Sequence, residues 1–171
     1  GVKIGPSVAK LPLDAMLALT ALRRGLSDRY DAVHSHEEGG LIGVVLAAAL
    51  RVPHLYDMHS SLPQQIINFG YRGMPGLARV LSWLERIMIR RSRVVIAICQ
   101  DLDETVQRVD PHVPTVVIEN APGSGSRPTA GTGAAVRQAL QLDADTPIAV
   151  YTGTFEHYQG LDLLFAAARL V

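Results

Sequence analysis

The sequence lacks an excess of charge of either sign, and it contains a single cysteine. Its 171 residues include 16 basic and 16 acidic side chains, so the formal net charge is zero at pH 7. A general nucleic-acid binder needs a basic surplus to contact phosphates, and the balance of charge argues against that class. The one cysteine, Cys99, excludes an intramolecular disulfide and suits a reducing compartment.

Long hydrophobic segments are absent as well. The longest apolar run covers residues 41–50, whereas a membrane-spanning helix needs about 20 apolar residues. The run therefore predicts a buried helix. The first ten residues, GVKIGPSVAK, have no long apolar core and do not predict a secretory signal peptide. From these features we expect a cytoplasmic protein.

What the chain does contain is an alternation of apolar runs with helical patterns, in a composition that is 48% hydrophobic. This alternation predicts an α/β fold with a parallel sheet of βα units. The expected strands cover residues 2–5, 31–36, 52–58, 93–98, 115–118 and 148–152. The expected helices cover residues 13–26, 39–50, 64–68, 77–91, 101–108 and 134–140, and a last one begins at 161. Asp101 and Glu104 form a capping-box pattern, which predicts that Asp101 is an N-cap.

The composition changes at residues 122–133, PGSGSRPTAGTG, which are typical of a flexible linker. We therefore predict a partial N-terminal Rossmann-like domain over residues 1–121, a linker over 122–133, and the first elements of a second such domain over 134–171. The chain opens on Gly1 rather than methionine and closes without a helix stop signal. These features predict a fragment of a longer protein.

Charge is unevenly distributed along the chain. Residues 68–93 contain six arginines and one acid, Glu85, and the predicted helix there also carries Trp83 and Met88. A basic amphipathic helix can lie on an anionic membrane surface, so residues 77–93 are a candidate for peripheral membrane contact on the inner face of the membrane. The alternative is a helix packed on the sheet with a solvated arginine face.

The stretch VHSHEEGG, residues 33–40, has two histidines at the spacing of one strand face. His34 and His36 could therefore converge on one metal ion, as in hydrolases with an H-x-H motif. His54, Asp57 and His59 could add ligands, but from a separate strand. Barrels of that type need about 250 residues, and the partner residues of the metallo-β-lactamase pattern are missing, because Glu38 and Gly39 stand in their place. We favour no metal, with His34 packed inside the sheet and His36 at its carboxyl edge, where open α/β sheets bind ligands.

Two further segments follow strand ends. His59 comes directly after the expected strand 52–58, at the same edge as His36 if the strands are neighbours. A histidine there can donate a hydrogen bond to a sugar hydroxyl or orient an acceptor, the alternative being a structural residue that caps the loop. Residues 153–160 form a loop between two glycines, and free backbone N–H groups in it could meet a phosphate. The loop has neither P-loop nor G-x-G-x-x-G spacing.

Five stretches, in this order, resemble the group 1 (family 4-like) retaining glycosyltransferases, which use nucleotide sugars and have the GT-B fold. They are YDAVHSHEEGG, VPHLYDMHSS, WLERIMIRRSRVVIAICQDLDE, VVIENAP and YTGTFEHYQGLDLLFAAARL. The resemblance covers nearly the whole chain after Asp31. It implies a truncated GT-B protein with a Rossmann-like parallel sheet.

The resemblance also implies roles by position. His36 and His59 match histidines on the N-terminal side of the cleft, where acceptor and transferred sugar meet, and Asn120 matches the residue at the domain crossing. The loop that faces the donor diphosphate corresponds to Gly153, Thr154, His157, Gln159 and Gly160. Such enzymes need no metal or other cofactor, because positive side chains and helix ends stabilise the departing diphosphate. Thr154 and Gln159 depart from the family, which often has Arg and Lys at these positions.

The leading hypothesis is therefore part of a retaining hexosyltransferase that moves a sugar from a nucleotide-diphosphate donor to a glycan or lipid-linked acceptor. As a fragment, the chain alone is expected to be inactive. Three alternatives stay open at this point. They are a sugar-nucleotide epimerase of the same fold, a metal-dependent hydrolase built on H-x-H, and a non-catalytic module that binds a nucleotide or a partner.

Overall fold

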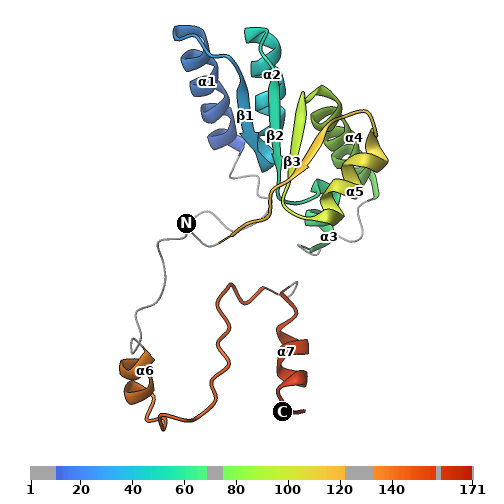
Figure 1. The fold of residues 1–171 in the computed structure, drawn as a ribbon. Helices are drawn as coiled ribbons and strands as arrows, with labels where there is room; N and C mark the ends of the chain where they lie inside the picture. The colour runs from blue at the N-terminus through green and yellow to red at the C-terminus, as the bar shows by residue number, and fades with distance from the viewer. Residues whose placement is uncertain (1–10, 69–74, 122–132, 157–158, 171) are drawn as a thin grey trace. The chain divides into compact units, whose positions relative to one another are not determined.

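The computed structural model describes residues 11–68, 75–121, 133–156 and 159–170. The chain divides into two compact units, residues 1–119 and 120–171. The first unit contains a four-stranded parallel sheet in the order β1-β2-β3-β4, whose strands lie side by side in Figure 1. The strands are β1 (Val33–His36), β2 (His54–Met58), β3 (Val94–Ala97) and β4 (Thr115–Val117). The predicted α/β class with a Rossmann-like parallel sheet is confirmed.

The described residues contain seven α-helices, five in the first unit and two in the second. The first unit has α1 (Leu11–Ser27), α2 (Gly40–Leu50), α3 (Leu62–Asn68), α4 (Pro75–Arg91) and α5 (Gln100–Val109), and a short 3-10 helix, η2 (Glu37–Gly39), precedes α2. The second unit has α6 (Gly133–Ala139) and α7 (Leu161–Ala167). All of these α-helices correspond to helices expected from the sequence, with ends that agree or differ by at most two residues.

One face of the sheet is covered by α2, α4 and α5. Each crossover leads to the next strand in the same direction, and right-handed crossovers of this kind place their helices on one face. Along β2 the side chains of His54, Tyr56 and Met58 are buried, whereas Leu55 and Asp57 are half-buried. The alternation shows that β2 turns its odd-numbered residues toward the other face of the sheet.

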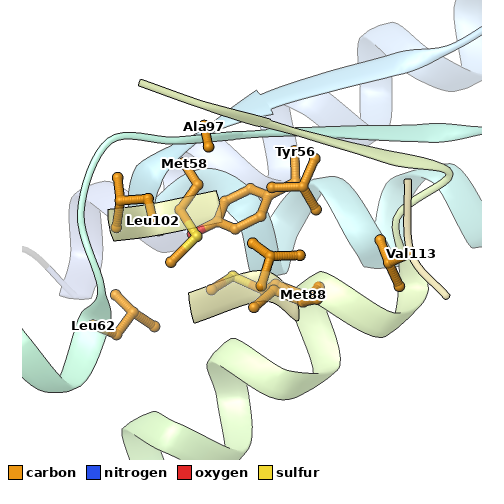
Figure 2. Packing of buried hydrophobic residues seen from close by; sticks show 10 residues of the cluster. Tyr56, Met58, Leu62, Met88, Ala97, Leu102 and Val113 are labelled. Atoms are coloured by element: carbon orange, nitrogen blue, oxygen red, sulfur yellow. The ribbon is translucent and has the colours of Figure 1, made fainter. Parts of the chain in front are cut away.

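The core lies between this face and the helices. Figure 2 shows Tyr56 and Met58 of β2 packed beside Met88 of α4, with Leu102 of α5 and Ala97 of β3 close by. Tyr56 is 1% exposed and Met88 is fully buried. The predicted basic helix therefore packs on the sheet through its apolar side.

Two glycines bring α2 close to the sheet. A Cβ on Gly40 would lie 2.5 Å from Sδ of Met88, and one on Gly43 would lie 2.5 Å from Nε2 of His54. A side chain at either position would force neighbouring atoms to shift. Glycine therefore lets α2 approach His54 of β2 and Met88 of α4 closely.

Two predictions of local structure are wrong. Asp101 is not the N-cap of α5, because the helix begins at Gln100 and Cys99 occupies that position. The acid lies instead in the first turn, where its charge interacts favourably with the helix dipole. Residues 148–152 are not a strand, because they pair with no neighbouring strand among the described residues of their unit, and a strand exists only as part of a hydrogen-bonded ladder.

The remaining expectations cannot be compared with the structure in full. The strand expected at residues 2–5 lies outside the described residues, and so do positions 122–132 of the expected linker. Gly133, its last predicted residue, begins α6. The assignment of residues 1–121 and 134–171 to two Rossmann-like domains stays a prediction.

Candidate functional site

The carboxyl ends of β1 and β2 meet at one edge of the sheet. His36 is the last residue of β1 and stands in register with Asp57 of β2, and His59 follows the end of β2 by one residue. The rings of His36 and His59 lie with their centroids 4.3 Å apart, in an edge-to-face arrangement at 67°. Two histidines from separate strands therefore face each other at the edge where open α/β sheets bind ligands.

Asp57 joins this pair. Its Oδ1 lies 3.2 Å from Nε2 of His59, and its Oδ2 lies 3.8 Å from Nε2 of His34. A carboxylate this close to Nε2 of His59 favours the tautomer with its proton on Nε2, in which Nδ1 is the acceptor. The sequence motifs indicate no role for Asp57 in sugar transfer. Asp57 reaches this site because it is the second-last residue of β2 and pairs with His36 in the sheet, so that both side chains lie on the same face.

The prediction that His34 packs inside the sheet is wrong. Its side chain is 57% exposed, because β1 turns Val33 and Ser35 toward the helices and His34 and His36 to the other face. The alternation of VHSH specified two faces, but it did not specify which of them α2 covers.

The buried histidine is His54, at the start of β2 and 2% exposed. Its Nδ1 lies 2.9 Å from Oγ of Ser92, and its Nε2 lies 2.7 Å from Oγ of Ser35. Because Ser92 donates its own proton to the carbonyl of Met88 at 2.6 Å, Nδ1 of His54 is the donor and Nε2 accepts from Ser35. Burial lowers the pKa of His54, and the nearby His34 lowers it further. His54 points to the helix-covered face and therefore contributes nothing to the His36 edge.

Glu37 connects the end of β1 to the segment after His59. Its two carboxylate oxygens accept hydrogen bonds from Oγ of Ser60 at 3.0 and 2.9 Å and from Nε2 of Gln65 at 2.7 Å. Its backbone is left-handed, with φ at 50°, a conformation that costs a non-glycine residue energy. Glu37 begins the short 3-10 turn that leads from β1 into α2. Its bonds could not be expected from sequence, because their partners are 23 and 28 residues away.

Glu85 holds the same segment from the other side. This α4 residue is 4% exposed, and its Oε2 accepts a hydrogen bond from the backbone N–H of Leu62 at 2.8 Å. Burial raises the pKa of Glu85, while hydrogen bonds from Ser61 and Leu62 act in the opposite direction. Two carboxylates, Glu37 and Glu85, thus fix the chain directly after His59.

The expected donor residues lie in the second unit, whose position relative to His36 and His59 is not determined. Gly153 and Thr154 are exposed, and the carbonyl of Thr154 accepts a hydrogen bond from the hydroxyl of Tyr151 at 2.8 Å. Gln159 is exposed, and Gly160 is the N-cap of α7, with a left-handed φ of 70°.

The other two predicted donor-side residues are Asn120 and His157. Asn120 is exposed and begins the second unit, and His157 lies outside the described residues. The donor role of all six residues stays a prediction.

The comparison with known proteins decides the family. A sequence model described as "Glycosyl transferase 4-like domain" matches residues 1–121. The chain belongs to this family. An alpha-maltose-1-phosphate synthase of Mycolicibacterium smegmatis is 29% identical over 168 residues, which cover 91% of this chain and 42% of the relative. The chain therefore spans less than half the length of this relative.

The glycosyl transferase 4-like match includes the sheet and the His36 edge. It supports the resemblance stated from the motifs, and it does not favour the H-x-H hydrolase or the epimerase. In the part of the chain that the structure describes, no helix is both long enough and apolar enough to cross a membrane.

Proposed function

We propose that the protein containing this chain is a retaining glycosyltransferase, which moves a hexosyl group from a nucleotide-diphosphate sugar to a glycan or lipid-linked acceptor. The observation that carries the proposal is the meeting of His36 and His59, 4.3 Å apart, inside the glycosyl transferase 4-like region. The name of the relative, a synthase of an α-configured sugar phosphate, supports sugar chemistry.

In this proposal the His36 edge binds the sugar and the acceptor. His59, held by Asp57 at 3.2 Å, presents Nδ1 as an acceptor for a sugar hydroxyl, while His36, on the more exposed side, contacts the same group from the end of β1. A hydroxyl held between two imidazoles is fixed in orientation, which is how a binding site contributes to transfer before any bond breaks. No metal or other cofactor takes part in the step as we propose it.

The donor diphosphate is assigned to the second unit. The exposed segment from Gly153 to Gly160 offers backbone N–H groups, and Asn120 lies at the start of the unit. Because Thr154 and Gln159 replace the cationic residues common in the family, backbone groups carry more of the charge stabilisation. A Thr154→Glu variant should raise the KM for the donor through repulsion, and an unchanged KM would remove the loop from the donor site.

Replacement of His59 tests the acceptor side. In the full-length protein, His59→Ala should lower turnover with a nucleotide-sugar donor by at least tenfold, since it removes one of the two facing rings and the partner of Asp57. His112→Ala is the matched control, because the His112 side chain is exposed at a distant loop and only its backbone N–H is bonded, to Asp110. Equal turnover of the two variants would exclude His59 from the site.

We also propose that the protein is cytoplasmic and touches the membrane surface through residues 77–93. The outer side of α4 carries Trp83, 60% exposed, and Val80, 52% exposed, next to the exposed Arg79 and Arg86. Apolar side chains between arginines are typical of helices that bind anionic surfaces. Arg90 is only partly available, since its guanidinium lies 3.6 Å from Asp110.

Sedimentation with vesicles distinguishes this surface from a solvated helix face. Replacing Arg86, Arg90 and Arg91 by Gln should abolish co-sedimentation with vesicles rich in phosphatidylglycerol. The control replaces three exposed arginines elsewhere, Arg23, Arg24 and Arg29, and changes the net charge equally. If both triple variants bind the vesicles alike, α4 is not the contact surface.

A further inference from the structure

Three metal-ligating side chains converge at the carboxyl edge of the sheet. His36, Asp57 and His59 each offer one ligand atom, and these atoms all lie within 4.8 Å of one another. We propose that they form a binding site for a divalent transition-metal ion, best matched by Zn²⁺, and that this ion competes with the sugar. The metal site stands on its own geometry, whereas the competition rests on the proposed function.

The geometry needs little change to accept an ion. Zinc binds imidazole nitrogen at about 2.0–2.1 Å and carboxylate oxygen at about 2.0–2.2 Å, so neighbouring ligands in a tetrahedron are about 3.4 Å apart. Nε2 of His59 and Oδ1 of Asp57 are already separated by 3.2 Å. His36 is exposed, and its ligand atom already lies within 4.8 Å of those of Asp57 and His59, so the proposal requires only a side-chain rotation of His36.

The surroundings support these ligands. The backbones of His36 and Asp57 are fixed by their register in the parallel sheet, and the residue after His59 is bonded to Glu37. The second oxygen of Asp57 faces His34 at 3.8 Å. These contacts hold the backbones of His36 and Asp57 and the segment after His59 in place, as outer-shell partners do around metal ligands.

The donor set also selects the ion. Two imidazoles and one carboxylate suit Zn²⁺ and similar transition metals, whereas Mg²⁺ prefers oxygen ligands alone. Three protein ligands leave a fourth position for water, which makes the ion exchangeable. Binding the ion through Nε2 would move the proton of His59 to Nδ1, which could then no longer accept a hydrogen bond from a sugar hydroxyl. Since His36 would also be turned to the ion, the expected effect of the ion on transfer is inhibition.

Calorimetric titration of the chain with Zn²⁺ alone, in buffer without chelator, tests the site. We expect one saturable site per chain, at least tenfold weaker in His36→Ala and in Asp57→Ala, and unchanged in His112→Ala. Circular dichroism of each variant confirms that the fold is retained. Absence of a saturable site, or equal affinity in all four proteins, would overturn the proposal and leave adventitious binding only.

The competition is tested separately in the full-length protein. Zn²⁺ at a concentration that fills the site should lower the rate of sugar transfer by at least tenfold, the effect should reverse on chelation, and Mg²⁺ should have none. If the site binds Zn²⁺ but transfer proceeds unchanged, the competition is refuted. If no transfer occurs with or without chelator, the proposed function fails, while the titration still decides the metal site.

Discussion

Gly43→Ala tests the close packing against the sheet of α2, the helix that follows β1 and His36 in the chain. A methyl group on Gly43 would lie 2.5 Å from Nε2 of His54 and 2.6 Å from Cβ of Ser35. Cβ of Ser35 is fixed to the backbone of β1, so no rotamer change relieves the contact. The helix must therefore move away from the sheet.

The expected change in the free energy of unfolding combines two destabilising contributions and one stabilising contribution. Overpacking a well-filled core costs about 1–3 kcal/mol. The methyl group also separates Ser35 from His54, now 2.7 Å apart, and a buried nitrogen without its partner costs about 1–3 kcal/mol more. Alanine is a better helix former than glycine by about 1 kcal/mol. We expect a net loss of about 1–5 kcal/mol in the free energy of unfolding.

Gly39→Ala is the matched control. A Cβ on Gly39 meets nothing within 4 Å, and its φ of −62° is ordinary for alanine, so we expect a change within about 0.5 kcal/mol. Urea unfolding followed by far-ultraviolet circular dichroism measures both variants, with the m-values compared to confirm a common unfolded state. If Gly43→Ala unfolds at the same urea concentration as Gly39→Ala, the close approach of α2 to His54 is refuted.

Three further predictions concern His54, Glu37 and Glu85. Because burial lowers the pKa of His54, the unfolded chain takes up a proton first, and stability should fall as the pH drops below about 6.5. His54→Gln should reduce this slope in urea unfolding at a series of pH values, and an unchanged slope would assign it to other groups. Glu37→Ala should lose about 1–2 kcal/mol with its hydrogen bonds, and Glu37→Gly should lose less in the same assay because glycine accepts the left-handed backbone. Equal losses would show that the backbone conformation is not costly. Glu85→Ala should lose about 2 kcal/mol by leaving the Leu62 N–H unpaired, whereas Glu85→Gln should keep most of the stability at pH 7, and a larger loss for Gln would contradict this account.

The positions of the helices and of β1–β4 were predictable because each rests on local periodicity. The residues of β1 and β2 read as strands in the sequence, and the ends of these strands indicated where His36 and His59 would lie. Two predictions of local structure were wrong, those for residues 148–152 and for Asp101. Residues 148–152 have a strand-like composition, but no neighbour pairs with them among the described residues of their unit. The capping-box pattern predicted Asp101 as the N-cap, but the helix begins one residue earlier, at Gln100, with Cys99 as its N-cap.

The sequence by itself determined the class of fold, the order of its elements and the two histidines at adjacent strand ends. The hydrophobic periods of 2 residues for strands and 3.6 residues for helices are local properties of the sequence, as are the turn residues between them. They can therefore be read without knowledge of the tertiary structure. The motifs in order were also sufficient to indicate the family.

Only the tertiary structure decided which face of each strand is buried and which distant side chains meet there. It exposed His34, which had been expected inside the sheet, and buried His54, because the covering by α2 depends on packing and not on the alternation of β1. It also joined Glu37 to Ser60 and Asp57 to His59. Such contacts depend on strand register and on the close approach of helix and sheet, which no local stretch of sequence specifies.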